Sequence, residues 1–375
     1  MNQLIRGKLR RLFVLCGIAL LIFVFGLSST GVAYFYSNGF YQFTSVIQRF
    51  FSSLFPFSLG DVLYFILVAY CLFSIYKAFK NWNSNSKAVI PIQLISFTLI
   101  LYIVFKLLWG LNYSRPSITE ELGISHEKYT TKDLVQLGGF LIQRVNTLEW
   151  KLKSTQSKRQ FSIKELESKS KIAYDKLAKV NSFFTYRIPA VKPVVFNWLV
   201  TKIGIEGYYS PPSGEANVNM RLPAVGLPFV TCHEISHELG VAREDEANLV
   251  GYLTSINSDD LNFQYSGYYN ILRSVLFEIR IKSPEDFDLL YQQINAGTIA
   301  DFKREQEFWK LYNGDMAAYM GTALDKFLKI NNQAKGTDSY QDIVLWVFNL
   351  HKSEFTAMSD QKQPALSPLI PSFGK

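Results

Sequence analysis

The stretch "TCHEISHELGVAREDEANLVGYL", residues 231–253, holds two of the chain's four histidines within five positions. His233 and His237 are four residues apart, so both imidazoles lie on one face of a helix and can reach a single ion. Glu234 points about 100° further round the helix, where it can take a proton from water at the ion instead of binding the ion. The spacing therefore predicts a helix that carries a metal centre.

Zinc is the metal that suits this pattern. It binds two neutral imidazoles and one carboxylate and keeps a fourth position for water, whose pKa falls to roughly 7. Gly240 ends the first helix, and "EDEAN" opens the next one with three acids that could supply the third ligand, Glu244, Asp245 and Glu246. The competing interpretation is a pair of surface histidines on an acidic helix.

The first third of the chain predicts a membrane domain. Residues 12–48 contain no charged side chain, and further apolar runs cover residues 61–77 and 88–105. A helix needs ~20 residues to cross a bilayer; the second and third runs are close to this length, and the first exceeds it. We expect three transmembrane helices at about 12–36, 57–77 and 88–109, with Trp109 and Tyr113 as interfacial anchors. The first run is too long for a cleaved signal peptide, so we expect it to be retained.

The basic residues predict the orientation of these helices. Four precede the first run, three separate the second from the third, and the intervening loop offers only Arg49. Because cytoplasmic loops are enriched in Lys and Arg, the N-terminus is expected in the cytoplasm and the C-terminal domain outside it. The seven residues on the two cytoplasmic segments are Arg6, Lys8, Arg10, Arg11, Lys77, Lys80 and Lys87.

The net charge of +8 belongs to the membrane domain. Residues 1–113 hold nine Lys or Arg and one acid, and residues 114–375 hold 30 of each sign. The expected partners are therefore a lipid bilayer and no nucleic acid. Cys232 is the single cysteine after residue 113, so no disulfide forms within that domain, and we expect a small buried residue there.

The predicted fold class is mainly α, of the α+β type. Three transmembrane helices (residues 1–113) precede a mostly helical domain with a small β element (114–360) and a Pro-rich tail (361–375). Prolines and glycines exclude long helices from residues 181–228, where "GEANVNMRLP" indicates a short extended segment. Besides the helices of the motif, we expect helices over 131–153, 162–180, 265–281, 284–294, 300–311, 315–330 and 340–352. Thr130 and Asp133 have the spacing of a capping box at the start of the first of these helices.

The motif resembles the gluzincin branch of the zincin metallopeptidases. In that branch the third ligand is a Glu on the following helix, four residues before an Asp or Asn. The resemblance implies that Glu244 is the third ligand, with Glu246 as the rival, and that Asn248 hydrogen-bonds a liganding imidazole, His233 above all. The interval from His237 to Glu244 is shorter than in typical gluzincins, so a compact turn is implied.

Nearly the full chain resembles a bacterial three-span membrane family of unknown function. The resemblance rests on "WGLNY", "GYYSPPSGEANVN", "LPFVTCHEISHELG" and "AREDEANLVGYL" in that order. It implies a zinc-peptidase-like domain attached to the bacterial cytoplasmic membrane. Zincins lay the substrate backbone along an edge strand, a role that we assign to "GEANVNMR" with Glu215, Asn217 and Asn219 as substrate-binding residues.

These features favour a membrane-anchored zinc metallopeptidase that hydrolyses peptides or proteins outside the cytoplasm. One alternative is a zinc-dependent amide hydrolase acting on cell-envelope substrates. Another is a catalytically inactive, metal-stabilised scaffold or binding protein, which would have no need of Glu234. An oxyanion-stabilising side chain is also expected, and the candidates are Tyr208, Tyr209, Tyr252, Tyr268 and Arg243.

Overall fold

A computed structural model describes residues 3–80, 86–157, 160–312, 314–331, 333 and 342–360. The chain divides into two compact units. The first, called here the membrane unit, comprises Met1–Pro116 and Ser210–Glu215; the second, the helical unit, comprises Ser117–Tyr209 and Ala216–Lys375. The predicted Pro-rich tail at 361–375 lies outside the described residues.

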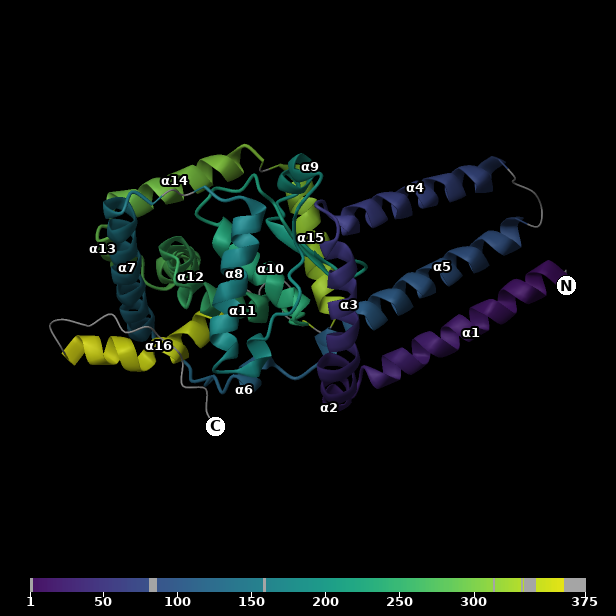
Figure 1. Ribbon diagram of the computed structural model, residues 1–375, viewed down its shortest axis with the longest axis horizontal. Coiled ribbons are helices and arrows are strands. Elements are labelled where there is room, and N and C mark those ends of the chain that lie inside the picture. Colours follow the sequence, from purple (N-terminus) through teal and green to yellow (C-terminus); the bar gives the residue numbers. More distant parts are fainter. Residues whose placement is uncertain are drawn as a thin grey trace. The chain divides into compact units, whose positions relative to one another are not determined.

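The membrane unit is built from three long helices and several short ones (Figure 1). Two of its helices, Leu59–Lys80 and Val89–Leu108, are long and apolar enough to cross a membrane. α5 packs against α1, and the ring centroids of Tyr70 on α4 and Phe97 on α5 are 6.2 Å apart. The elements are α1 (Gln3–Phe25), α2 (Ser29–Gly31), the π-helical η1 (Val32–Phe40), α3 (Tyr41–Ser53), α4 (Leu59–Lys80), α5 (Ser86–Leu108) and the 3-10 helix η2 (Gly110–Ser114).

The first apolar run does not form the single helix expected at about 12–36. α1 ends at Phe25, and the segments Ile5–Phe25 and Ser29–Ser53 are bent by 98° at the break. Ser28 causes the new start, because it has extended backbone angles and its hydroxyl accepts a hydrogen bond from the Gly31 N–H at 3.2 Å. The described residues thus offer two candidate spans, or three if the bent pair counts as one.

The aromatic residues after α5 also differ from the prediction. Trp109 and Tyr113 are 6% and 1% exposed, so they are buried within the membrane unit and are not interfacial anchors. Their rings pack edge to face at 5.3 Å. Next to them Asn112 accepts a hydrogen bond from Ser37 at 2.9 Å, which ties η2 to η1. The "WGLNY" segment therefore belongs to the core of this unit.

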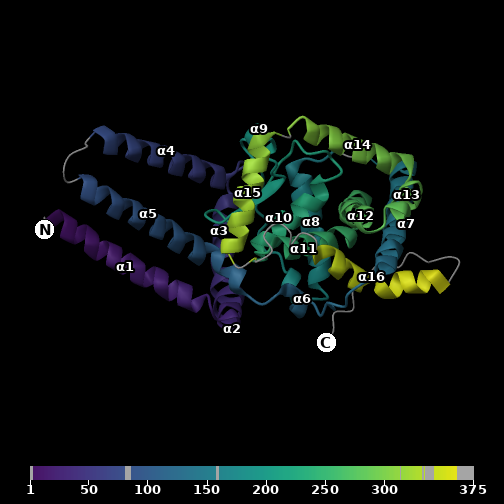
Figure 2. The ribbon, with the colours of Figure 1, turned by 180° about the vertical axis from the view of Figure 1, so that it is seen from behind.

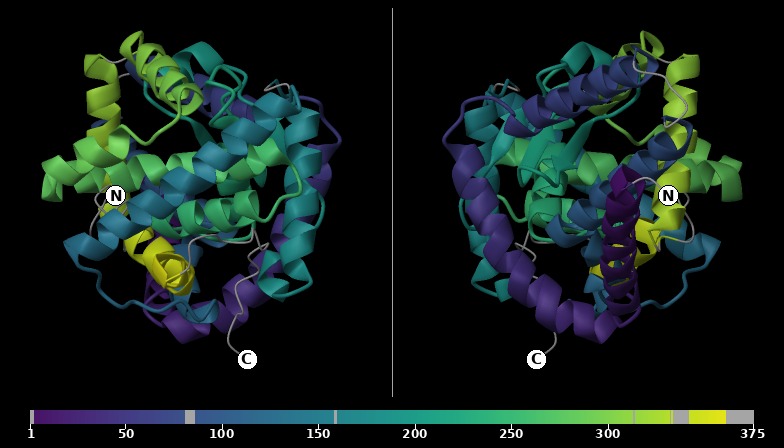
Figure 3. Two further views of the ribbon diagram at one scale, coloured as in Figure 1. Left: turned by 90° about the vertical axis from the view of Figure 1, so that its left-hand side faces the viewer. Right: turned by 90° about the vertical axis from the view of Figure 1, so that its right-hand side faces the viewer.

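The helical unit is mainly α-helical (Figure 1, Figure 3). α12 packs along α7, and α11 contacts α10, α12 and α16. Figure 2 shows α12 end-on beside α7. The helices are α6 (Ile118–Glu121), α7 (Thr131–Ser154), α8 (Ile163–Ala178), the 3-10 helix η3 (Ser182–Phe184), α9 (Asn197–Lys202), α10 (Leu227–Glu238), α11 (Glu244–Ile256), α12 (Leu261–Lys282), α13 (Pro284–Tyr291), α14 (Ala296–Lys310), α15 (Asp315–Ile330) and α16 (Asp342–Asp360).

The prediction of a mainly helical chain with a small β element is confirmed. The sheet has three strands, β1 (Val191–Pro193), β2 (Gly207–Ser210) and β3 (Glu215–Val218), in the order β1-β3-β2. β1 runs parallel to β3, with Val191 opposite Ala216 and Pro193 opposite Val218. All four residues of β3 are buried, as expected for the middle strand of a covered sheet.

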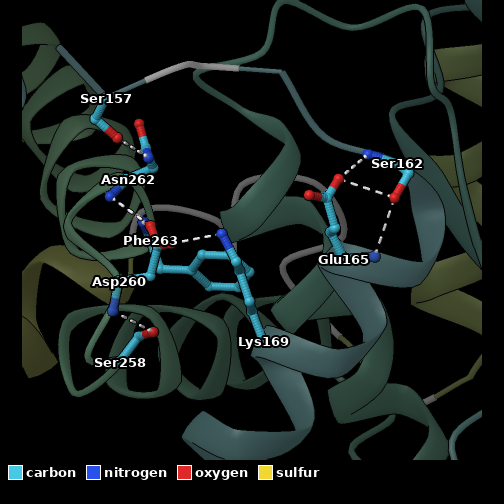
Figure 4. A network of polar contacts seen from close by, with 8 residues as sticks. All are labelled: Ser157, Ser162, Glu165, Lys169, Ser258, Asp260, Asn262 and Phe263. Atoms are coloured by element: carbon cyan, nitrogen blue, oxygen red, sulfur yellow. Dashed lines mark hydrogen bonds and ion pairs between the residues drawn. The ribbon is translucent and has the colours of Figure 1, made fainter.

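Side-chain caps fix several helix starts. Thr130 and Asp133 form the predicted capping box before α7, and Ser162 and Glu165 form a second one before α8. Figure 4 shows the second box together with the start of α12. There Asp260 accepts a hydrogen bond from the Asn262 N–H at 2.8 Å and forms an ion pair with Lys169 at 2.7 Å. This ion pair links α8 to the cap of α12.

Candidate metal centre

The helix α10 carries His233, Glu234 and His237. It begins with Pro228 in its first turn, where the missing N–H is harmless, and it ends at Glu238. Gly240 follows with φ +86°, a left-handed conformation that glycine adopts without strain and that commonly closes a helix. The chain then turns back within three residues, and α11 begins at Glu244.

α11 packs closely against α10 because Gly251 has no side chain. A Cβ at this position would lie 3.1 Å from the backbone nitrogen of His233 and 3.2 Å from its Cα. The close approach brings Asn248, one turn earlier on α11, to the imidazole of His233. The first turn of α11 is rich in acids, which the positive end of the helix dipole stabilises.

Both imidazoles are oriented by carbonyl oxygens. The Nδ1 of His233 lies 2.9 Å from the side-chain oxygen of Asn248, and the Nδ1 of His237 lies 2.6 Å from the carbonyl oxygen of Val241. A carbonyl oxygen only accepts, so each Nδ1 carries a proton and each Nε2 is the ring nitrogen available to bind a metal. The two Nε2 atoms are 3.2 Å apart.

Glu244 completes a triangle with these two nitrogens. Its Oε2 lies 3.3 Å from the Nε2 of His233 and 3.8 Å from that of His237. Zinc–ligand bonds of about 2.0–2.2 Å in a tetrahedral arrangement separate the ligands by roughly 3.3–3.5 Å. Two of the three separations, 3.2 and 3.3 Å, are close to this spacing, and the third, 3.8 Å, is longer.

The charges in the cluster are unbalanced in a way that a cation would correct. Burial lowers the pKa of His237 to about 4. Burial also disfavours charge on His233, but Glu244, Glu234 and Asn248 outweigh it and raise the pKa of His233 to about 9. His233 thus carries an extra proton, which lies among the unprotonated Nε2 of His237 and the carboxyl groups of Glu234 and Glu244. A metal ion bound by these residues would replace that proton.

Glu234 lies beside the triangle. Its ligand atom is within 4.8 Å of those of His233 and His237, and its side chain is buried. Burial and the charges of Glu244 and Glu206 raise the pKa of Glu234 to about 8, although His233 opposes the shift. Within the described part of the chain, Oε2 of Glu234 is buried without a hydrogen-bond partner. A carboxylate of this kind is suited to accept a proton.

Two carboxylates could complete the ligand set, and the geometry favours Glu244 over Glu234. The Oε2 of Glu244 lies 3.3 Å from one Nε2 atom and 3.8 Å from the other. Glu246, the rival from the sequence, turns away: its Oε1 accepts hydrogen bonds from Arg243 at 3.0 Å and from the Ile118 N–H at 3.3 Å. Glu246 therefore fastens α6 and the start of α11.

The segment that holds the expected substrate-binding residues is not an edge strand, so that part of the prediction is wrong. β3 is the middle strand, and Glu215, Asn217 and Asn219 are completely buried. In the membrane unit, Glu215 accepts hydrogen bonds from the backbone N–H groups of Leu59 at 3.0 Å and Gly60 at 2.7 Å, at the start of α4.

Asn219 has a structural role too. Its amide nitrogen donates to the Thr201 hydroxyl at 2.9 Å and to the Ile205 carbonyl at 3.1 Å. Its side-chain oxygen accepts the Arg221 N–H at 3.1 Å. These contacts shape the loops on either side of the sheet.

The edge strand beside Glu234 is β2. A Cβ at Gly207 would lie 2.6 Å from the Oε1 of Glu234 and 2.9 Å from the backbone oxygen of Asn217, so only glycine fits there. Nothing in the sequence distinguished Gly207 from the other glycines of this Pro- and Gly-rich segment. The carbonyl of Val241 escaped prediction as well, because a backbone acceptor has no side-chain signature.

The structure narrows the list of oxyanion-stabilising candidates. The Tyr252 hydroxyl is fully buried and lies 2.6 Å from Nε2 of His351, and Arg243 is paired with Glu246. Tyr208 is partly exposed and lies on β2 next to Gly207.

Cys232 is fully buried, as expected, with its thiol 3.6 Å from the Ser170 hydroxyl.

Fold and site together define a class: a mainly helical protein with helices apolar enough to cross a membrane, and a buried His–Glu cluster beside the edge of a small sheet. The chain matches the family described as "Protein of unknown function (DUF3810)" over residues 36–348, and it belongs to this family. A search of curated proteins and a search of solved structures found no match.

Proposed function

We propose that this protein is a membrane-anchored zinc metallopeptidase that hydrolyses peptide bonds outside the cytoplasm. One observation carries the proposal: two imidazole Nε2 atoms and a carboxylate oxygen converge at 3.2, 3.3 and 3.8 Å. Each Nδ1 is already bonded to a carbonyl oxygen, so the lone pairs of both Nε2 atoms are directed at the same point. Such a set of acceptors is stable around a cation.

His233, His237 and Glu244 would hold the ion. When bound, zinc supplies Lewis acidity and lowers the pKa of a coordinated water to roughly 7. Among the described residues the Oε2 of Glu234 has no hydrogen-bond partner, so it would accept the proton of the attacking water, and Glu234 would return it to the nitrogen of the departing amine. The water oxygen bonds to the scissile carbonyl carbon and the C–N bond breaks.

β2 is suited to bind the substrate backbone. It is an edge strand, and Gly207 lets it pass directly against Glu234. An extended peptide that pairs with an exposed edge gains main-chain hydrogen bonds without a demand on its side chains. The zincin resemblance of the sequence supports the same use of an edge strand, with β2 replacing the segment first expected.

Glu234 favours an enzyme over a scaffold that uses the metal only for stability. A structural site has no use for a buried carboxylate whose oxygen lacks a hydrogen bond, because burying that group costs free energy. A catalytic site needs such a carboxylate, because the group must be free to receive a proton.

The test of the proposal is Glu234→Gln in the full-length protein. The amide has the shape of the carboxylate but cannot accept the proton of the attacking water. We expect peptide hydrolysis to fall by at least about a hundredfold while zinc content and helicity stay at the wild-type level. Glu285→Gln removes an exposed carboxylate of the same unit and is the matched control. Undiminished hydrolysis by Glu234→Gln would contradict the assigned role.

A further inference from the structure

A small hollow lies next to the metal centre in the helical unit. It is lined by two carboxylates, by one amide and by Gly226 and four apolar side chains: Glu206, Glu305, Asn270, Leu222, Pro223, Val225 and Trp309. Glu206 immediately precedes Gly207, the residue that β2 places against Glu234. A group bound in this hollow would therefore belong to a molecule that also reaches the metal centre.

The two carboxylates differ in their partners. Glu305 forms an ion pair with Arg273 at 2.6 Å and accepts a hydrogen bond from the Tyr269 hydroxyl at 2.7 Å. The carboxylate of Glu206 has no hydrogen bond from any described residue. Glu206 is charge-coupled to Arg273, Glu305 and His233, but burial is the largest influence and raises its pKa.

The hollow holds one ion pair and one further carboxylate. Arg273 pairs with Glu305, and among the described residues Glu206 forms no ion pair, although Arg273 and His233 favour its charged form at longer range. A partly buried carboxylate in an apolar surround is stabilised by a cation that also donates hydrogen bonds to it. The chemistry of the hollow thus selects a positively charged ligand.

The size of the hollow selects the kind of cation. It has room for about one water-sized group at its centre. A primary ammonium is a compact charge with three donors, whereas a guanidinium is a broad planar fork. A primary ammonium is therefore the better match for this space.

We propose that Glu206 recognises a primary ammonium group of the substrate, and that the hollow is the specificity site of the peptidase. The inference rests on the proposed function, because the ligand must be the same molecule whose peptide bond reaches Glu234. The ammonium belongs either to the substrate's N-terminus or to a lysine side chain. Both sources present the same chemistry to Glu206.

Hydrolysis of matched peptide pairs tests the proposal in the full-length zinc-loaded protein. One pair compares lysine with norleucine, which has a similar length and no charge; a second compares free with acetylated N-termini; a third compares lysine with arginine. We expect kcat/KM to favour the ammonium member of the first or second pair by about tenfold or more. The pair that shows the preference identifies the source.

Glu206→Gln should reduce that preference to less than about twofold, and Glu285→Gln should leave it intact. An undiminished preference in Glu206→Gln, or no preference in the wild type, would overturn the assignment. Where the lysine–norleucine pair shows the preference, arginine cleaved as well as lysine would overturn it too.

Binding separates this inference from the proposed function. Calorimetry with n-butylammonium chloride, with n-butanol as the uncharged control, needs no catalysis. If the wild type cleaves no peptide yet binds butylammonium in a manner that Glu206→Gln abolishes, the hollow is an ammonium site and the peptidase proposal fails alone. Equal binding by wild type and Glu206→Gln, or no binding by either, would overturn the ammonium site.

Discussion

At the scale of single residues, the cluster on α10 and α11 assigns different tasks to neighbouring acids. Glu244 faces the two imidazoles, and Glu246 bonds to Arg243 and to the backbone of Ile118. Glu234 lies beside the imidazoles, and its buried Oε2 has no hydrogen-bond partner among the described residues. Glu234 belongs to α10, whereas Glu244 and Glu246 share the first turn of α11, so the direction of each side chain decides its role. Single substitutions can distinguish the roles of these residues.

Glu244→Ala should lose the metal, whereas Glu246→Ala should keep it. The second variant should instead be less stable by roughly 1–3 kcal/mol, because the buried N–H of Ile118 loses its acceptor. Zinc content and the thermal midpoint of both purified variants measure the difference. Zinc retained by Glu244→Ala but lost from Glu246→Ala would reverse the ligand assignment.

The sequence predicted the residues of this cluster only as far as side-chain spacing reaches. The i, i+4 spacing placed His233 and His237 on one face, and the zincin resemblance directed attention to Glu244 and Asn248. The spacing could not distinguish Glu246 from Glu244 as the third ligand, because Glu246 bonds instead to Ile118, which lies 128 positions away in the sequence. Long-range contacts of this kind leave no local pattern.

At the scale of elements, helix starts are controlled by short polar side chains. Asp260 caps α12 and also pairs with Lys169 on α8 (Figure 4). Burial alone would raise the pKa of Asp260, but the hydrogen bonds from Lys169 and from the Asn262 N–H outweigh it and lower the pKa below its ordinary value of 3.8. The charged form therefore stabilises the folded state.

Asp260→Asn should retain the cap and lose the ion pair, at a cost of about 0.2–1 kcal/mol near pH 7. Asp260→Ala should cost roughly 0.5–2 kcal/mol more, because it also loses the cap. Since the folded pKa is depressed, the contribution of the charge is present above 3.8 and is lost as pH falls through the lower folded value.

Thermal midpoints of wild type and Asp260→Asn should therefore converge between pH 7 and pH 3. A difference that stays constant over this range would show that the charge of Asp260 contributes nothing.

The sequence predicted the bounds of the helices better than it predicted how the elements are arranged. Periodicity and capping spacing predicted α7 at 131–153, and the structure has it at Thr131–Ser154. The break after Phe25 was missed because the apolar character continues across it, although Ser28 begins a new helix there. The position of β3 in the middle of the sheet depends on its pairing with β1, which hydropathy does not encode.

At the scale of the whole molecule, the orientation in the membrane stays a prediction. Seven basic residues flank the candidate spans on the two segments expected in the cytoplasm. A reporter enzyme that works only after export should be active when fused after Lys375 and inactive when fused after Lys80. Activity of the Lys80 fusion, or none of the Lys375 fusion, would reverse the orientation and place the metal centre in the cytoplasm.

The metal content of the full-length protein tests the central claim most directly. After purification without chelators, elemental analysis should find about one zinc per chain in the wild type. His237→Ala should hold almost none, because it removes one corner of the triangle. His126→Ala should match the wild type, since His126 bonds to Thr119 away from the cluster. A wild type without transition metal even after zinc is supplied, or equal zinc in all three proteins, would contradict the account.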